Sequence, residues 1–234
     1  HSDSSAASDV YKRQISNKIY SKTMTQTIPA KDINIRFLID NLGLQKNQDE
    51  EFFREWQDNL PELTDLEKQL LDQVKAGFFN LIDYPPVLEN VVRMSVVDPI
   101  LFIGGFFLYP LYIRNEPAVN LALEDEDIII KGKIDTLVLK DQFWAMVIES
   151  KKAEFSLEVG RSQILAYMLA NPHPNRPNYG MISTGGGFMF VKLVNGEIPQ
   201  YALSKGFLTL NPGNELYDVL RILKRLTQIA LEGI

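Results

Sequence analysis

The chain has 234 residues, with 24 Lys and Arg against 30 Asp and Glu, a net charge of −6, no Cys and two His. Without Cys, disulfides, thiolate zinc sites and Fe–S clusters are excluded, and His1 and His173 are too few for a multi-histidine metal site. Any metal ion must therefore sit on oxygen ligands. The charge is uneven, because residues 1–130 carry 12 basic and 21 acidic side chains whereas residues 131–234 carry 12 and 9. The second half is thus free to meet a polyanion.

The N-terminal third is mostly polar. The run SSAASDVYKRQ resembles a translated sequencing-adapter scar, so we expect residues 1–14 to be non-native and without function. Residues 15–84 are expected to form an N-terminal helical extension, in which residues 15–48 are irregular or weakly ordered and a helical pattern begins at Glu50. Residues 85–234 are expected to form the main domain.

No stretch is long and apolar enough to predict a membrane span. The most apolar one, from Pro99 to Ile113, is uncharged but shorter than the roughly 20 residues that a bilayer needs, and Pro and Gly interrupt it. We interpret it as buried core. The N-terminus also lacks the pattern of a secretory signal, so the cytoplasm is the expected location.

Two helices are predicted before the strand-rich half. The segment from Thr64 to Glu67 has the form of a capping box, and apolar residues at every fourth position from Leu66 to Phe78 predict an amphipathic helix that ends before Pro85. A second helix is expected from Val87 to Pro99, with Glu89 in its first turn.

After Glu116 the apolar pattern alternates. The runs from Ile128 to Leu139 and from Phe143 to Ile148, separated by a turn around Asp141, predict a β-hairpin. A helix from about Ser156 to Ala170 follows. The remaining predicted elements are three strands, Tyr179 to Ser183, Phe188 to Val194 and Gln200 to Leu203, and a closing helix, Glu215 to Leu231. This order predicts an α/β fold.

Two carboxylates and a lysine are expected to converge at the end of the hairpin. Glu149 and Lys151 are two residues apart, so their side chains leave one face of the sheet, and Asp135 lies roughly opposite Glu149. This set suits Mg²⁺ or Mn²⁺, which would lower the pKa of a bound water and neutralise the charge that builds up on a phosphodiester. A cross-strand ladder of charges without chemistry is the alternative.

The same residues carry a family resemblance. Asp135 with Glu149-Ser150-Lys151 resembles the PD-(D/E)XK nuclease signature in the form D-x13-E-x-K, and Gln163 and Tyr167 resemble the Q-x3-Y motif of its RecB-like and type I restriction branches. The stretch from Leu88 to Leu226 is similar to stand-alone cyanobacterial proteins named after the R subunit of type I restriction enzymes. The resemblance implies a restriction-endonuclease-like core, with a helix, a mixed central sheet that contains the catalytic hairpin, and a further helix.

The resemblance also implies an activity, that of a bacterial Mg²⁺-dependent endodeoxyribonuclease. The implied catalytic residues are Asp135, Glu149, Lys151 and Gln163, and the metal ligands are Asp135, Glu149 and, as an extra carboxylate from the preceding helix, Glu89. The candidates for substrate contact are Tyr167, Lys133, Lys152 and Arg161. Core packing of the tyrosine and solvation of the three cations are the alternatives.

DNA is the expected partner, and no membrane partner is expected. No Walker motif is present, so any motor or specificity subunit would be a separate chain, and a homodimer is compatible with the sequence. A second hypothesis keeps the nuclease fold as an inactive subunit that binds DNA or a partner. A third has the acidic N-terminal helices mask the basic half. The surplus of only three positive charges in residues 131–234 predicts weak intrinsic DNA affinity.

Overall fold

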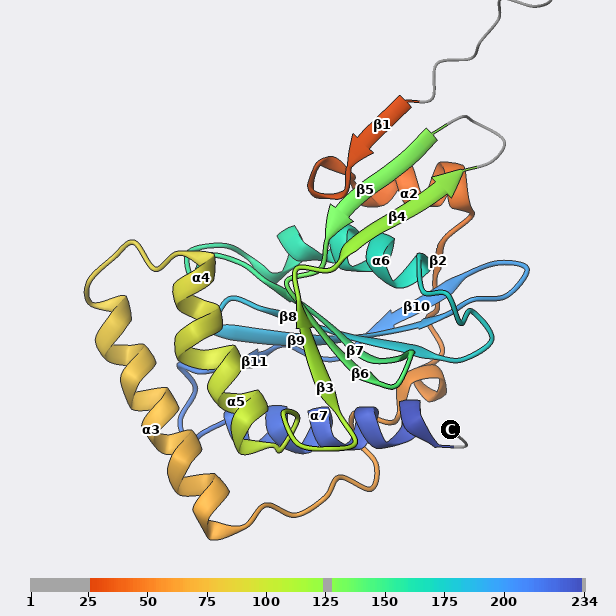
Figure 1. Ribbon diagram of the computed structural model, residues 1–234. Coiled ribbons are helices and arrows are strands. Elements are labelled where there is room, and N and C mark those ends of the chain that lie inside the picture. The colour runs from red at the N-terminus through yellow and green to blue at the C-terminus, as the bar shows by residue number, and fades with distance from the viewer. Residues whose placement is uncertain (1–25, 124–127, 233–234) are drawn as a thin grey trace, which may run out of the picture.

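The computed structural model describes residues 26–123 and 128–232 and shows a mixed β-sheet with helices on both faces (Figure 1). The strands of this main sheet are β2 (Gln45–Lys46), β3 (Tyr112–Asn115), β6 (Thr136–Lys140), β7 (Phe143–Ser150), β8 (Asn178–Ser183), β9 (Gly187–Val194), β10 (Gln200–Leu203) and β11 (Phe207–Leu208). Their order is β2-β10-β9-β8-β7-β6-β3, with β11 beside β9. β7 and β8 are parallel, whereas β6 and β7 are antiparallel. The predicted α/β class is confirmed.

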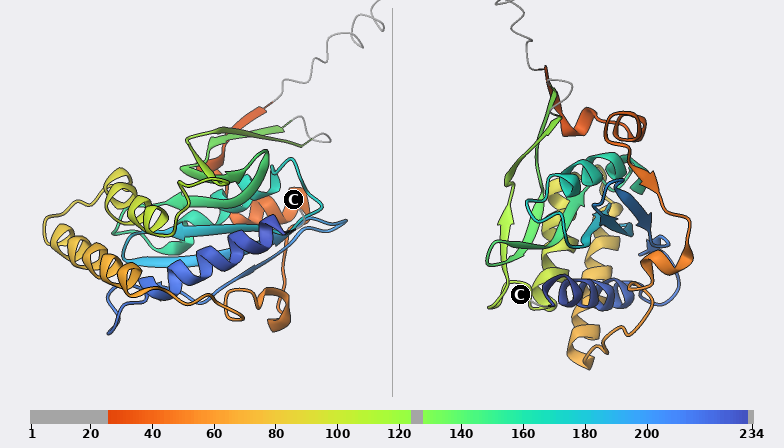
Figure 2. Two further views of the ribbon diagram at one scale, coloured as in Figure 1. Left: turned by 60° about the horizontal axis from the view of Figure 1, so that its bottom comes forward. Right: turned by 90° about the vertical axis from the view of Figure 1, so that its right-hand side faces the viewer.

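The helices are α2 (Ile35–Leu42), α3 (Asp65–Ile82), α4 (Glu89–Val92), α5 (Asp98–Ile103), α6 (Arg161–Leu169) and α7 (Leu216–Leu231). α6 and α7 cover opposite faces of the main sheet (Figures 1 and 2). Within the described residues, no helix has the length and apolar character that a membrane crossing requires. The predicted capping box of α3 is confirmed, since the Thr64 N–H donates to Glu67 Oε2 at 2.8 Å and the Glu67 N–H donates to Thr64 Oγ1 at 3.2 Å.

A small second sheet lies beside α6, on the side away from the main sheet (Figure 1). It contains β1 (Gln26–Pro29), β5 (Ile128–Lys133) and β4 (Ala118–Leu123), and β1 is parallel to β5. The prediction of irregular structure is wrong for residues 26–48, which form β1, α2 and β2. Asn34 caps α2 by accepting the Phe37 N–H at 2.9 Å, so a helix of only eight residues is stabilised by its cap and by one buried side chain. Residues 1–25, with the predicted non-native segment, lie outside the described residues.

The run from Ile128 to Leu139 was predicted to be one strand of a hairpin, but it forms two strands. It divides at Ile134-Asp135 into β5, which joins the small sheet, and β6, which joins the main sheet. The predicted turn to β7 is present, with Asp141 at a φ of 54°, and the register pairs Thr136 with Ile148. The sequence marks this change of sheet only by a short polar interruption, Lys131-Gly132-Lys133, within the apolar run. Asp135 therefore lies in the crossing between the two sheets.

The helix that was expected to stop at Pro99 continues to the end of α5. A π-turn, Arg93–Val97, joins α4 to α5, and the Asp98 N–H reaches back to the Arg93 carbonyl. Pro99 lies at the start of α5, inside this continuous helical stretch, and has no N–H to donate to the preceding turn. The wider π-turn thus allows the helix to continue past a proline.

The apolar stretch from Pro99 to Ile113 is only partly buried, so its interpretation as core is wrong for four large side chains that are exposed: Phe102, Phe107, Leu108 and Tyr109. Ile100 and Leu101 are inaccessible to solvent, whereas Phe102 is 73% and Tyr109 97% exposed. Phe102 lies on the outer side of α5, and Tyr109 lies in the turn between α5 and β3.

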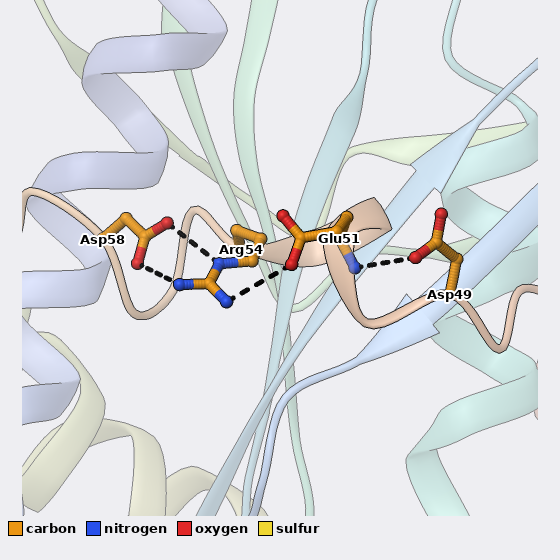
Figure 3. A network of polar contacts seen from close by, with 4 residues as sticks. All are labelled: Asp49, Glu51, Arg54 and Asp58. Atoms are coloured by element: carbon orange, nitrogen blue, oxygen red, sulfur yellow. Dashed lines mark hydrogen bonds and ion pairs between the residues drawn. The ribbon is translucent and has the colours of Figure 1, made fainter.

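The helical pattern expected from Glu50 gives only a 3-10 turn, Glu50–Phe53. Figure 3 shows the local bonds that close it: the Asp49 carboxylate accepts the Glu51 N–H at 3.0 Å, and Arg54 donates to Asp58 through Nε and Nη2, both at 3.0 Å. These bonds form a compact turn around Arg54 in place of a longer helix.

Two hydrophobic cores lie on the two faces of the main sheet. Successive residues of β7 alternate between them, since Met146 and Ile148 pack on the α7 side and Val147 packs on the α6 side. Residues before position 85 belong to both cores, for example Leu38 on the α6 side and Phe78 on the α7 side. The alternation continues beyond Val147 and directs the next side chain of that face, Glu149, toward α6.

Candidate active site

The end of β7 carries the two central residues of the predicted site. Glu149 lies near the end of the β7–β8 pairing, opposite Ile182. The Lys151 N–H extends that pairing by donating to the Ser183 carbonyl at 2.8 Å. Both side chains are nearly inaccessible, with Glu149 1% and Lys151 7% exposed. The predicted sharing of one face is confirmed, because the Lys151 Nζ lies 2.7 Å from Glu149 Oε1.

Helix α6 supplies the second half of the cluster. The Lys151 Nζ also donates to Gln163 Oε1 at 2.8 Å, and the Gln163 Nε2 donates to the Tyr167 hydroxyl at 2.9 Å. Gln163 and Tyr167 are one helical turn apart and therefore point the same way. Four residues that sequence patterns singled out are thus joined by three consecutive hydrogen bonds.

Asp135 joins the cluster through the backbone. Its Oδ2 accepts the Ser150 N–H at 2.7 Å, which fixes the carboxylate beside the Glu149-Ser150-Lys151 segment. Burial raises the pKa of Asp135, against the Ser150 N–H and the charge of Lys151, which lower it. The crossing between β5 and β6 thus delivers a carboxylate to the end of the neighbouring strand.

Glu149 is the most perturbed carboxyl group of the cluster. Burial, followed by the charge of Asp135, raises its pKa to about 8, although the Lys151 ammonium opposes this shift. The second carboxylate oxygen, Oε2, is buried and has no hydrogen-bond partner. Burying such an oxygen without a partner costs free energy, so a cation or a hydrogen-bond donor beside Oε2 would stabilise the site.

These residues fit a magnesium or manganese ion. Mg²⁺ binds through one or two carboxylates and completes its shell with water and phosphate oxygens. Asp135 and Glu149 would hold the ion, and the unbonded Oε2 is an oxygen free to do so. Among the residues that the structure describes, no group of three or more His, Asp or Glu side chains is arranged to hold a metal.

Glu89, the expected third carboxylate, therefore does not form a three-carboxylate metal site with Asp135 and Glu149 in the structure. It lies exposed at the start of α4, and its charge is a minor cause of the raised pKa values of Asp135 and Glu149. Arg93, which the sequence prediction did not select, lies one helical turn later and lowers the pKa of Asp135. Its Nε is buried without a hydrogen bond, 4.0 Å from Asp98 Oδ2. The spacing of four from Glu89 was the only sequence signal for it.

The three candidate cations for substrate contact lie outside the buried cluster. Lys133 is 67% exposed at its side chain and 3.6 Å from Glu116, and Arg161 is 2.7 Å from Glu158. Lys152 is half-buried, with its ammonium 5.7 Å from the centre of the Phe155 ring. These positions suit contact with an approaching chain and are equally typical of solvated surface groups.

Tyr167 packs in the core, which the sequence left open as the alternative to substrate contact. Its side chain is only 3% exposed and packs in the core on the α6 side, while its hydroxyl ends the hydrogen-bonded chain from Lys151. Burial raises its pKa to about 12. Gly132 of β5 lies against the ring, since a Cβ there would come within 2.6 Å of Tyr167 Cε1. The tyrosine therefore supports Gln163 from within the core.

The site rests on this geometry. No protein-family model matches the chain, and a comparison with curated proteins finds no match either.

Proposed function

We propose that this protein is a divalent-metal-dependent nuclease that hydrolyses phosphodiester bonds in DNA and has a restriction-endonuclease-like fold. The observation that carries the proposal is the position of Lys151, which bonds to both Glu149 and Gln163 while Asp135 accepts the neighbouring Ser150 N–H. The order of the β6–β7 hairpin, the α6 crossover and the parallel strand β8 agrees with the resemblance to PD-(D/E)XK nucleases.

Each residue has a role that follows from its chemistry. Asp135 and Glu149 would hold the ion, which when bound would activate water and balance charge on the phosphate. Lys151 is a compact, buried cation that would stabilise the extra negative charge of the transition state. Gln163 holds the Lys151 ammonium in place, and Tyr167 holds Gln163.

The reaction is a simple exchange of P–O bonds. Water forms a bond to phosphorus, the ester bond to the leaving oxygen breaks, and the proton lost by water is balanced by the proton that the leaving oxygen takes up. Lys133, Lys152 and Arg161 would contact flanking phosphates without reading sequence. The small positive surplus of this half of the chain implies weak intrinsic affinity that depends on salt.

The test is cleavage of supercoiled and linear DNA by the purified chain in Mg²⁺, Mn²⁺ and EDTA. We expect nicking or linearisation in the metals, none in EDTA, and none from Asp135→Asn. DNA binding that persists without cleavage in any divalent metal would contradict the proposal. That outcome would favour the inactive nuclease-fold subunit. The supporting observation is that Glu149 and Lys151 form an ion pair with each other at 2.7 Å and are nearly inaccessible to solvent.

A further inference from the structure

An apolar pocket of about 220 Å³ opens where the end of α3 meets the loops that follow β7 and β8. Phe78 and Ile82 form its α3 side, and Val87, Ala153 and Gly186 form the other walls. Within the described residues, a larger hollow of about 600 Å³ is charged and lies at the β2–β10 edge, lined by Lys46, Asp49 and Arg54 among others.

The walls of the apolar pocket continue the segments that build the candidate active site. Ala153 follows Lys151 by two residues, and its N–H donates to the Val87 carbonyl at 3.2 Å. Val87 precedes Glu89 by two residues. Gly186 lies three residues after Ser183, whose carbonyl accepts the Lys151 N–H. Since an extended residue spans at most about 3.6 Å, the pocket lies within roughly 10 Å of the Lys151 backbone, at the end of β7 and on the α7 side of the sheet, whereas the Lys151 side chain points to the α6 side.

The lining selects a flat, largely apolar ligand. The pocket offers no buried cation to bind a phosphate, and its charged lining residue, Glu154, is exposed at the rim. A cavity of about 150 Å³ lined by apolar side chains holds one benzene ring, so about 220 Å³ suits a single larger heterocycle with its polar edge toward the mouth. The Phe78 ring provides an aromatic wall, on which nucleobases stack irrespective of sequence.

We propose that this pocket binds one unstacked base of the DNA strand being cut, from a nucleotide next to the scissile phosphate. The inference deepens the proposed function and rests on it, because it needs the phosphate to lie at the Asp135–Glu149–Lys151 cluster. A base inside a duplex must first leave its stack to enter such a pocket, which costs free energy. The pocket therefore predicts a preference for single-stranded or unpaired DNA over intact duplex.

Gly186 allows the pocket to be filled without strain. A Cβ at Gly186 would lie 3.7 Å from the Phe78 ring, an ordinary contact, and Gly186 does not adopt the left-handed conformation of Gly185. Gly186→Leu should thus obstruct the pocket and keep the fold. Leu210, 66% exposed at the rim, provides a second variant, Leu210→Glu, whose carboxylate would repel the strand. The matched control is Gly196→Leu, in an exposed loop with one backbone atom within 4 Å of the new Cβ.

The first experiment uses a single-stranded oligonucleotide with 2-aminopurine placed at each position in turn, bound at low salt in EDTA so that no strand is cut. We expect one position to change its fluorescence at least twofold with wild type and Gly196→Leu, and to lose this change with Gly186→Leu and Leu210→Glu. A response at no position, or a response that persists in both pocket variants, would overturn the inference. Failure to bind any single strand would overturn it as well.

The second experiment separates this inference from the proposed function. In Mg²⁺, an abasic residue at the responsive position should lower kcat/KM by about 10-fold, as the loss of one base–aromatic stack would. Cleavage that proceeds equally well on abasic strands would refute the pocket and leave the nuclease intact. A fluorescence response with no cleavage in any metal would refute the nuclease and leave a base-binding pocket.

Discussion

The Lys151 ammonium lies 2.8 Å from Gln163 Oε1 and thereby connects the end of strand β7 to helix α6. The bond fixes a buried cation between a helix amide and the Glu149 carboxylate. Since Gln163 is held in turn by Tyr167, the position of the cation depends on a side chain packed in the core.

Gln163 and Tyr167 are expected to act as one unit. Gln163→Leu removes one acceptor of Lys151 and one of the two donors to the Tyr167 hydroxyl, the other being the Lys133 backbone, and should lower the free energy of unfolding by about 1–3 kcal/mol. Tyr167→Phe should cost a similar amount, and the double variant less than the sum, with a coupling of about 0.5–2 kcal/mol in urea melts. Strict additivity would show that the two side chains do not cooperate.

Glu149 should make the stability of the metal-free protein fall with pH. Its pKa in the folded state, about 8, lies above its ordinary value of 4.5, so the native state holds the proton between these values and is destabilised as pH rises through that window. We expect the melting temperature of the wild type in EDTA to drop by several degrees from pH 5 to pH 8, at about 2–4 °C for each kcal/mol.

Glu149→Gln should show a smaller drop, because the substituted amide does not titrate. The control is Glu197→Gln, an exposed loop position, which should keep the pH dependence of the wild type. An equal drop in Glu149→Gln and wild type would contradict the assignment of the shift to this carboxyl group.

Gly132 is required by the approach of the Tyr167 ring. Gly132→Ala would place its Cβ 2.6 Å from Tyr167 Cε1 and 2.8 Å from the Ala30 Cβ, so we expect a loss of about 1–3 kcal/mol of stability and displacement of Tyr167. Gly77→Ala in α3, where no atom lies within 4 Å of the new Cβ, should instead stabilise by about 0.5–1 kcal/mol. If both substitutions stabilise, the close contact at Gly132 does not exist.

The segment before residue 85 should be indispensable for folding. Phe53, Leu71 and Phe78 are at most 3% exposed and belong to the core that α7 covers. We therefore expect a chain of residues 85–234 to lack a cooperative thermal transition in circular dichroism. The control lacks only residues 1–14 and should melt like the full chain. Cooperative melting of residues 85–234 would show that the predicted extension is dispensable.

Sequence patterns predicted the elements that depend on local chemistry. The capping box starts α3, and the runs that predict β8, β9 and β10 lie within one residue of the observed strands. The period of two placed Glu149 and Lys151 on one face, and the spacing of four placed Gln163 and Tyr167 together. These inferences need only the neighbours along the chain.

The remaining features depend on tertiary structure. The run from Ile128 to Leu139 has a polar interruption at Lys131-Gly132-Lys133, but this interruption does not show that the two halves join different sheets, because that depends on the strands with which each half pairs. Arg93 is the first residue of the π-turn, and its charge lowers the pKa of Asp135. This effect depends on how the helix packs near the sheet crossing, which the helical pattern alone does not show. Similarly, the exposure of Phe102 follows from the one-sided packing of α5, and that of Tyr109 from its place in the turn after this helix, neither of which composition reveals.

The most direct test of the account is the single-turnover rate of DNA cleavage in Mg²⁺ by wild type, Lys151→Met and the surface control Lys46→Met. The methionine keeps the volume of the lysine stem, and circular dichroism would verify the fold. We predict a rate for Lys151→Met at least about 100-fold below that of wild type, in line with the loss of one transition-state contact, and an unchanged rate for Lys46→Met. Equal rates for folded Lys151→Met and wild type, or cleavage that persists in EDTA, would contradict the account.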